Sequence, residues 1–538
     1  MLQASSRNDR QLTGSLSFLN FPRREQKYLK VGGKECNGGY KRLREQERLV
    51  MASRAVNILS LVFLVLILVF WTSSCAIDPV TGKHELMLIS ESQEIELGRQ
   101  TDIQVVREYG IYEDSELTAY LDNLCQQVAK VSHRPNLSYE CKIMDSTVIN
   151  AFAVPGGYIY FTRGIMAYLN NEAELVGVMG HELGHVTARH SAEQISRTQL
   201  AQAGLGLTFG LSETLRGFSD VVQFGVGMMF LKFSRYNERE SDDLGVEYSS
   251  NLGYDAIQMA NFFQTLDRMQ PSSDRSGLPE WFSTHPNPAD RDNTVRRKAK
   301  EWQEQLGLRN PKVNRTSYLK MIDGVVFGED PRQGFVEDSA FYHPGLRFVF
   351  PIPAGWELKN THVLVQIVSP KKDAIILFTL APAGSPEEAA RKFVSESGAG
   401  VVESGGRRVN GLPAYRLISQ LRSQQGTIYL LSYFIQKNTR VYVFHGLTSA
   451  NLFNNYHSSF EGTMEQFKEL RDPSKLKVEP ARIRIRSVQR AGSLRQVLQA
   501  FGVPEGNMEK MALLNGMRLT DQVPANTQLK IIDKGKYP

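Results

Sequence analysis

Apolar residues recur every three or four positions over most of residues 78–300. This spacing places them on one face of an α-helix, so the segment is predicted to be largely helical. Two shorter runs, 139–144 and 157–161, have strand character instead. The strongest helical patterns cover residues 92–109, 115–131 and 172–195, and the last is expected to form one long helix interrupted only by Gly177, Gly180 and Gly184.

The pattern changes at Phe341, where apolar runs separated by polar turns replace the helical spacing. Such runs predict antiparallel strands, and the helical patterns at 385–397 and 452–470 are expected to pack on one face of the resulting sheet. The predicted domain is an antiparallel α/β sandwich spanning residues 338–471. Its strand-forming runs are VLVQIV, AIILFTL, YRLISQL, IYLLSYFI and RVYVFHGL.

A charged linker around residues 472–479 leads to a short C-terminal module, residues 480–535. The module begins with the strand-like run RIRIRSV, continues with two short helical patterns and closes with the strand-like run TQLKII. A chain of 538 residues has room for three or four domains. We therefore predict an α+β multidomain fold with a mainly helical domain at 78–320, then the sandwich, then a small βααβ module.

The N-terminal region has the layout of a secretory signal. Residues 55–71 are almost unbroken in their apolar character, follow Arg54, and precede a group of small residues before Cys75. If translation begins at Met51, residues 51–75 form a signal of normal length, and residues 1–50 are a basic extension that is not translated. The alternative is an uncleaved membrane helix, because seventeen apolar residues are close to the minimum that spans a bilayer.

Cys75 is predicted to be a lipidation site. Its position resembles that of the lipidated cysteine in bacterial lipoproteins, although Thr72 stands where such signals usually have Leu. A lipid on Cys75 would anchor the mature chain in a membrane, as an uncleaved helix would. Both interpretations place the rest of the chain on the periplasmic side of the bacterial cell envelope.

Overall composition, 41% hydrophobic and 22% charged, is ordinary for a globular protein and indicates no function. Residues 1–50 contain eleven Lys or Arg against five Asp or Glu, which accounts for the whole net charge of +6. Because the remaining chain is neutral, no nucleic-acid partner is expected.

Two of the four cysteines, Cys125 and Cys141, lie sixteen positions apart. In an oxidising compartment they could form a disulfide. Two buried thiols are equally consistent with the sequence, because spacing alone does not fix the geometry.

The segment His181-Glu182-Leu183-Gly184-His185 contains two histidines four positions apart. On a helix this spacing puts both imidazoles on one face, where they can bind one metal ion, with Glu182 beside them. This is the zincin arrangement, in which zinc takes three protein ligands and lowers the pKa of a water molecule. Glu182 would then take a proton from the water and pass it to the leaving amine. The motif predicts one Zn²⁺ per chain.

A third ligand is required, and residues 234–242 offer candidates. Glu238 and Asp242 are four positions apart, so one can bind the metal while the other orients a ligating histidine. Spacing alone does not choose between Glu238 and Glu240 as the ligand, and a solvated charged helix is the alternative interpretation. The Gly-rich apolar segment 200–230 is expected to form a helical hairpin that roofs the site.

Four motifs together resemble one metallopeptidase family, that of the CAAX prenyl protease and the periplasmic beta-barrel assembly-enhancing protease. The motifs are Asn-Ala-Phe-Ala-Val-Pro-Gly-Gly at 150–157, the HELGH segment, Ser-Arg-x-x-Glu-x-x-Ser-Asp at 234–242, and His285-Pro286 with Arg291, in that order within residues 78–300. The resemblance implies a zinc endopeptidase, an HExxH gluzincin. Its implied ligands are His181, His185 and Glu238, with Glu182 as general base and Asp242 orienting a histidine.

The resemblance also implies how substrate binds. In the relatives, the strand after the Asn-Ala-Phe motif forms an edge on which the substrate lies extended. Ser241 departs from the family pattern, which more often has Ala there, without changing the ligand set. The implied edge residues are Tyr158, Ile159, Tyr160 and Phe161.

His285 lies at a stiff turn before Pro286 and could act on the metal centre in two ways. It could donate a hydrogen bond to the oxyanion of the tetrahedral intermediate, or it could bind the metal as a fourth ligand and hold the enzyme inactive. The related periplasmic protease implies the inhibitory role, and a turn histidine bonded to a backbone carbonyl is the structural alternative. His190, nine positions after His181, is expected to point elsewhere and to be structural.

The two C-terminal domains resemble known folds more loosely. Residues 480–535 resemble a LysM-type module, a class that binds peptidoglycan, and a plain structural cap is the alternative. Residues 338–471 resemble the PsbP or Mog-like sandwich class, which indicates a fold and no activity.

The sequence therefore predicts a zinc metalloendopeptidase of the bacterial cell envelope that cleaves misfolded or stalled envelope proteins. A chaperone or cell-wall-binding scaffold that retains the peptidase fold is the alternative, and Glu182 counts against it because a binder needs no general base. A mitochondrial member would need residues 1–50 to be a transit peptide, and the five acidic residues there count against that. The expected partners are protein or peptide substrates, a membrane and peptidoglycan.

Overall fold

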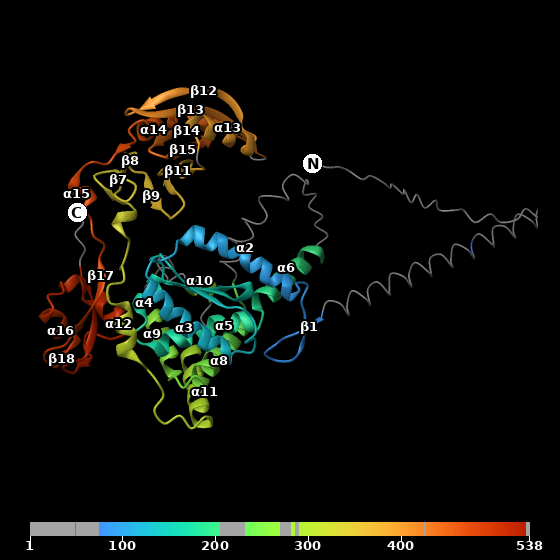
Figure 1. Cartoon of the computed structure of the whole chain (residues 1–538), viewed down its shortest axis with the longest axis vertical. Helices are drawn as coiled ribbons and strands as arrows, with labels where there is room; N and C mark the ends of the chain where they lie inside the picture. The colour runs from blue at the N-terminus through green and yellow to red at the C-terminus, as the bar shows by residue number, and fades with distance from the viewer. Residues whose placement is uncertain are drawn as a thin grey trace, which may run out of the picture. The chain divides into compact units, whose positions relative to one another are not determined.

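Helices and antiparallel sheets both occur along the chain in the computed structural model, so the predicted α+β class is confirmed (Figure 1). The structure describes residues 75–204, 232–269, 281–285, 290–382, 384–423 and 426–533, together with Leu49. The predicted extension, the signal segment up to residue 74 and residues 205–230 of the predicted hairpin lie outside the described residues, apart from Leu49. Among the described residues, no helix combines the length and apolar character needed to cross a membrane.

Capping side chains set where the long helices of the N-terminal half begin. Ser90 and Ser234 each form a capping box with the residue three positions on. Asp114 and Asn171 each accept a hydrogen bond from the backbone N–H at the corresponding position. The helices that begin at these caps are α2 (Glu91–Tyr109), α3 (Ser115–Val131), α5 (Glu172–Thr187) and α8 (Arg235–Asn251).

Helices α5 and α8 approach each other closely at glycine positions. A Cβ atom on Gly180 would lie 3.0 Å from the Cα atom of Gly245, and one on Gly184 would lie 3.1 Å from the Cα atom of Ser241. The glycines expected to interrupt the helical pattern therefore do not break α5. They let its backbone approach that of α8, so that short side chains on the two helices can meet.

The single long helix predicted for this region is wrong, because it is two helices. α5 ends at Thr187, and α6 (His190–Gly204) begins after Arg189, whose φ of 56° is left-handed. Partners outside the helix hold the Arg189 side chain: its Nε donates to Glu94 Oε2 (2.7 Å) and its Nη2 donates to the carbonyl of Ile89 (3.0 Å). The break therefore depends on contacts that are distant in sequence.

A three-stranded sheet packs beside α5. Its order is β3 (Glu140–Met144), β5 (Tyr158–Thr162) and β4 (Ala151–Val154), with β3 parallel and β4 antiparallel to β5. The predicted substrate edge on β5 is therefore wrong, because β5 is hydrogen-bonded on both sides. Among the described residues, the outer edge of β4 has no neighbouring strand. The residues that the prediction placed at the edge are Tyr158, Ile159, Tyr160 and Phe161.

A disulfide joins Cys125 of α3 to Cys141 of β3. Both residues are buried. The structure thus selects the paired alternative, which is the form expected in an oxidising compartment.

The remaining elements of the N-terminal half are shorter than helices α2, α3, α5 and α8. Two of them, β1 and β2, pair as an antiparallel hairpin. The set comprises β1 (Cys75–Ile77), β2 (His84–Leu86), η1 (Pro155–Gly157), α4 (Arg163–Tyr168), α9 (Ile257–Asp267), α10 (Trp281–Thr284), α11 (Arg291–Gln305) and α12 (Arg315–Ile322).

Two antiparallel sheets follow, with strand orders β12-β13-β14-β15-β11-β10-β9 and β16-β8-β7-β6. Aromatic residues from both sheets, among them Phe348, Phe378 and Phe444, share one buried core. The strands are β6 (Phe335–Glu337), β7 (Ala340–His343), β8 (Phe348–Pro351), β9 (Glu357–Asn360), β10 (Val365–Val368), β11 (Ala374–Ala381), β12 (Gly400–Val409), β13 (Leu412–Ser423), β14 (Gly426–Lys437), β15 (Arg440–Ser449) and β16 (Lys468–Glu469), and the short helices are η3 (Pro331–Gln333), η4 (Ala450–Leu452) and α15 (Pro473–Leu476).

The two longer helices of this region cover opposite faces of the larger sheet, and the prediction that both pack on one face is wrong. α14 (Phe453–Met464) packs into the core that contains Tyr433 of β14. α13 (Pro386–Ser397) packs on the cluster that contains Phe434. Successive residues of a strand point to opposite faces, so the two helices lie on different sides.

The C-terminal module contains a strand, two helices and a strand in that order. β17 (Arg482–Ser487) pairs antiparallel with β20 (Gln528–Asp533), and the short strands β18 (Gly492–Ser493) and β19 (Gln522–Val523) pair with each other. The helices between them are α16 (Leu494–Ala500), η5 (Glu505–Asn507) and α17 (Met508–Leu514).

This module shares its core with the helical domain. Its apolar residues belong to the same buried cluster as those of α3 and α5. Lys530, which is fully buried, donates hydrogen bonds from Nζ to the backbone carbonyls of Ala167 and Leu169, each at 2.7 Å. The module is therefore packed against the segment that leads into α5.

Candidate metal centre

Helix α5 carries two histidines whose imidazole rings lie close together. His181 and His185 are one turn apart, and both are buried. Their Nε2 atoms lie 3.1 Å apart. The pair therefore directs two nitrogen lone pairs into the same small volume.

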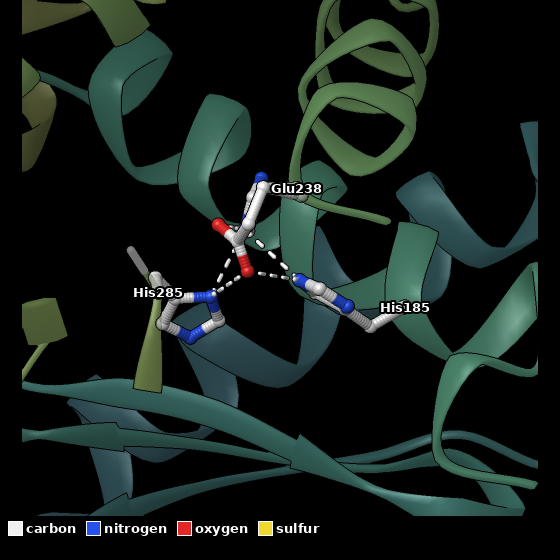
Figure 2. A group of neighbouring side chains, drawn as sticks. His185, Glu238 and His285 are labelled. Atoms are coloured by element: carbon white, nitrogen blue, oxygen red, sulfur yellow. Dashed lines mark hydrogen bonds and ion pairs between the residues drawn. The ribbon is translucent and has the colours of Figure 1, made fainter. Parts of the chain in front are cut away.

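Glu238 and His285 bring two further donor groups to that volume. Glu238, in the first turn of α8, has Oε1 3.6 Å from His185 Nε2 and Oε2 3.7 Å from His181 Nε2. His285, directly after α10, has Nδ1 3.1 Å from Glu238 Oε1, and Figure 2 shows the Glu238 carboxylate lying between the His185 and His285 rings. One donor atom from each of the four residues lies within 4.8 Å of the other three.

The donor set fits a divalent cation. Glu238 Oε2 and His285 Nε2 are buried and, among the described residues, have no hydrogen-bond partner. Leaving a buried carboxylate oxygen unpaired is costly, and a cation bound at Glu238 would satisfy it. Imidazole nitrogens with one carboxylate oxygen are a set that zinc uses when a position stays open for water. His181, His185 and Glu238 could thus hold a metal ion, with His285 at the remaining position.

Asp242 and Arg291 lie next to Nδ1 of His181, the ring nitrogen that faces away from the cluster. Asp242 Oδ1 lies 2.9 Å from His181 Nδ1. Arg291 donates to the same oxygen from Nη2 (2.7 Å) and Nε (3.2 Å), and its guanidinium lies 3.8 Å over the Phe263 ring. A carboxylate that accepts the Nδ1 proton selects the tautomer in which Nε2 is free to bind a metal.

Glu182 lies beside the cluster. Its Oε1 is 3.6 Å from His285 Nε2, and both carboxylate oxygens are buried without a hydrogen-bond partner of good geometry among the described residues. Burial raises the pKa of Glu182 to about 7, although the His285 ring opposes the rise. A carboxyl group with a pKa near neutrality can both accept and return a proton.

The pKa values of the cluster's histidines shift in different directions. Burial is the largest cause that lowers the pKa of His181 and of His185, so both rings are neutral near pH 7 in the form that a metal ligand requires. Burial also opposes protonation of His285. The carboxylates of Glu238 and Glu182 outweigh it and raise the pKa of His285.

The structure separates the two candidate carboxylates on α8. Glu238 lies in the cluster, whereas Glu240 lies outside it, with Oε2 3.0 Å from His190 Nε2. His190 in turn has Nδ1 3.0 Å from His185 Nδ1. The expectation that His190 points elsewhere is wrong, because the break between α5 and α6 turns it back toward the site.

Two aromatic residues also pack against histidines of the cluster, and no sequence motif predicted either contact. Trp281 stacks on His285 with ring centroids 4.2 Å apart, and Phe233 stacks on His185 with centroids 4.0 Å apart. Single aromatic residues between motifs have no characteristic spacing that would reveal such contacts. The stacking restricts the orientation of both imidazole rings.

The outer edge of β4 presents main-chain groups next to Glu182. The Thr162 N–H donates to the Asn150 carbonyl, so Asn150 is bonded to β5. Bonded and non-bonded residues alternate along an antiparallel pair, and therefore the N–H and C=O groups of Ala151 and Ala153 point away from β5. The Ala153 N–H faces the Glu182 carboxyl and opposes the rise of its pKa.

Known proteins share the segment that contains this site. Residues 115–299 match the model of Peptidase family M48. The match includes all four residues of the cluster together with Glu182, Asp242 and Arg291. Residues 115–299 form a peptidase family M48 domain. The M48 domain implies a bound metal, because the family consists of metallopeptidases.

Two relatives illustrate the likeness. The beta-barrel assembly-enhancing protease of Yersinia pestis is 29% identical over 240 residues, which cover 41% of this chain and 47% of the relative. The mitochondrial metalloendopeptidase OMA1 of Schizosaccharomyces pombe is 30% identical over 236 residues, which cover 42% of this chain and 65% of the relative. The chain thus spans about half the length of the first relative and somewhat more of the second. The first name says protease and the second says metalloendopeptidase, and together with the M48 domain they support a metalloendopeptidase.

A solved structure of cyanobacterial PsbP from Synechocystis sp. PCC 6803 covers 25% of this chain and 96% of its own length, at 15% identity and a TM-score of 0.22. A TM-score this low supports no conclusion about the fold or function of this chain. The PsbP or Mog-like assignment of residues 338–471 stays a prediction.

The M48 domain can bind a metal ion and move a proton beside it. Of the residues predicted for the site, it brings together His181, His185, Glu238 and His285, and it sets Glu182 and Asp242 next to them. The predicted edge residues lie on β5, which is one strand inward from the outer edge of the sheet at β4. Cys75 lies in β1, before the M48 domain begins.

Proposed function

We propose that this protein is a zinc-dependent endopeptidase of the bacterial cell envelope that cleaves misfolded or stalled envelope proteins. The observation that carries the proposal is the buried cluster of His181, His185 and Glu238 with the buried carboxyl group of Glu182 beside it. A purely structural zinc site is closed by four ligands and has no use for an acidic group next to it. A hydrolytic site needs both an open position and a base.

Zinc held by these three residues would supply a Lewis acid and a water molecule of lowered pKa. Glu182 accepts a proton from the attacking water on a carboxylate oxygen and then gives it to the nitrogen of the leaving amine. The raised pKa of Glu182 suits both transfers. Asp242 keeps the His181 ring in the orientation and tautomer that this arrangement needs.

The outer edge of β4 is the proposed substrate platform. The outward N–H and C=O groups of Ala151 and Ala153 can pair with an extended peptide, which adds a strand to the sheet. A peptide bound there has its backbone close to Glu182, because the Ala153 N–H faces that carboxyl. Main-chain pairing recognises extended segments of any sequence, which fits substrates that have lost their fold.

The direct test measures zinc and cleavage on the same purified full-length chain. We expect about one zinc ion per chain and hydrolysis of an unfolded protein such as β-casein. Chelation should stop hydrolysis, and added zinc should restore it. A chain that binds no metal, or hydrolysis that persists after the metal is removed, would contradict the proposal.

His285 is proposed to restrain the enzyme. Its Nδ1 lies 3.1 Å from Glu238 Oε1 and 3.3 Å from His181 Nε2, which places the ring where a fourth ligand would lie. The stacked Trp281 ring supports it, and the backbone N–H of Trp281 donates to the carbonyl of Ile149 just before β4. A histidine bound at the fourth position excludes the water that hydrolysis requires.

Replacing His285 with Ala is therefore expected to raise basal hydrolysis of β-casein or self-cleavage. The measurement is the initial rate per bound zinc, which separates release of inhibition from a change in metal content. If the rate instead falls by about 10²- to 10³-fold with zinc retained, His285 donates to the oxyanion and does not inhibit. An unchanged rate would indicate that His285 has a purely structural role.

The envelope location rests on three observations. Segment 51–75 has the layout of a secretory signal, the Cys125–Cys141 disulfide suits an oxidising compartment, and a bacterial relative is named a beta-barrel assembly-enhancing protease. The mitochondrial relative makes an organellar location the second candidate. The acidic residues within 1–50 disfavour a transit peptide.

Cys75 is proposed to carry the lipid that anchors the mature chain. The variant Cys75→Ser is expected to leave the membrane fraction, because no residue then accepts the lipid. Cell fractionation and the mass of the N-terminal peptide check this. An intact N-terminus upstream of residue 75 in the wild type would show instead that segment 55–71 remains as a membrane helix.

A chaperone or cell-wall-binding scaffold remains the second candidate function. It would act through the proposed sandwich at 338–471 and the LysM-like module at 480–535, with peptidoglycan as a ligand of the latter. The buried Lys530 and the shared core favour the cap interpretation of the module. Glu182 favours the peptidase, since burying a carboxyl group is costly and a scaffold gains nothing from it.

A further inference from the structure

His185 uses only one of its two ring nitrogens in the proposed metal site. Its Nε2 faces the cluster, and its Nδ1 lies 3.0 Å from His190 Nδ1. Two nitrogens at this distance form a hydrogen bond only if one carries a proton and the other does not. A neutral imidazole that binds metal through Nε2 has its proton on Nδ1, so His185 donates and His190 accepts.

The second nitrogen of His190 then carries a proton and needs an acceptor. Its Nε2 lies 3.0 Å from Glu240 Oε2. The His190 ring is buried, and the Glu240 side chain is 14% exposed, so water competes little for the bond. The carboxylate therefore fixes the tautomer of His190, and through it that of His185.

The backbone is arranged to make this contact. Five residues along a continuous helix would place His190 about 140° around the axis from His185, out of reach of its ring. The left-handed Arg189 ends α5 and turns His190 back, and Glu94 holds Arg189 in place (2.7 Å). Ser241, where the family more often has Ala, has its hydroxyl oxygen 3.4 Å from His190 Nδ1.

We propose that His190 and Glu240 are positioning residues that orient His185 for zinc through the hydrogen-bond series Glu240–His190–His185. His181 receives the same support directly from Asp242, at 2.9 Å. The two metal-binding histidines are thus each oriented by a carboxylate of α8, one of them through an intervening imidazole. This inference rests on the proposed zinc site and assigns a role to two residues outside it.

The test uses the variants His190→Phe and Glu240→Gln and their combination, in the full-length chain. His190→Phe keeps a ring of similar shape and removes both nitrogens, whereas Glu240→Gln keeps the size of the side chain and removes its charge. The matched control is Glu247→Gln, because Glu247 lies nine positions after Glu238, about 180° around α8. The measurements are the zinc dissociation constant by competition with a chelator, the visible spectrum of the cobalt-substituted protein, and the melting temperature of the metal-free protein.

We expect His190→Phe to weaken zinc binding about 10- to 100-fold and Glu240→Gln about tenfold, the range seen when an outer partner of a ligand is lost. The double variant should match His190→Phe, because both changes interrupt the same series. The cobalt spectrum should change in both variants, while the control keeps the wild-type values. The metal-free melting temperatures should stay close to that of the wild type.

Zinc affinity within about twofold of wild type in Glu240→Gln, with an unchanged cobalt spectrum, would overturn the proposal. Additive losses in the double variant would also overturn it, because they would place the two residues in separate interactions. If His190→Phe fails to fold, Glu240→Gln alone decides. A wild-type chain that binds no zinc is a different result, since it contradicts the proposed function itself.

Discussion

The variant Glu182→Gln is expected to keep its zinc and to lose peptide hydrolysis by at least about 10²- to 10⁴-fold. The amide has nearly the size of the carboxylate, so the site keeps its packing, but it cannot accept a proton from water at neutral pH. None of the four residues of the cluster changes. Zinc content and the initial rate of β-casein hydrolysis on the same sample are the two measurements.

Glu247→Gln is the matched control for this prediction, because it makes the same chemical change on a part-buried residue that pairs with His133. It should keep both zinc and hydrolysis. Substantial hydrolysis in Glu182→Gln would remove Glu182 from the role of general base. If cells that carry Glu182→Gln behave as wild type although hydrolysis is lost, this result would favour the scaffold function over the peptidase.

The parts of the fold that sequence predicted well are those that local chemistry determines. The pattern at 115–131 matches α3 because its apolar spacing and the cap at Asp114 agree. The strands of the two antiparallel sheets that follow the M48 domain match their apolar runs in the same way. The His-Glu-x-x-His spacing fixed the geometry of two ligands because both lie on one helix.

The predictions fail where residues distant in sequence determine the local structure. Nothing local to Arg189 indicates a helix break, since Glu94 and Ile89 stabilise it from another element. The place of β5 at the centre of its sheet depends on parallel pairing with β3, which leaves no trace in either strand. The prediction for His190 failed for the first of these reasons, because its direction depends on the break.

The C-terminal module shows the same limit. In the run TQLKII the lysine alternates with apolar neighbours and resembles a solvent-facing residue of a strand. Lys530 is instead fully buried, because the carbonyls of Ala167 and Leu169 accept its hydrogen bonds. Burial lowers its pKa, and the nearby Glu174 carboxylate opposes that shift. The packing partner lies more than three hundred residues earlier, so no local pattern could predict it.

The variant Glu238→Ala is expected to lose most of its zinc, with a fall in affinity greater than the roughly 10- to 100-fold range for loss of an outer partner of a ligand. Glu238 is the carboxylate of the cluster, and it offsets part of the charge of the cation. Elemental analysis after dialysis, with Glu240→Ala as the matched comparison on the same helix, ranks the two residues.

His285 makes a further comparison necessary, because three histidines remain close together when Glu238 is removed. They could retain some metal without the carboxylate. We therefore expect the loss of zinc in Glu238→Ala to become nearly complete when His285→Ala is added, while His285→Ala alone keeps the ion through His181, His185 and Glu238. Full zinc occupancy in Glu238→Ala together with loss in Glu240→Ala would show that Glu240 is the ligand. Full occupancy in both single variants would mean that neither carboxylate is essential and that the three histidines form the site.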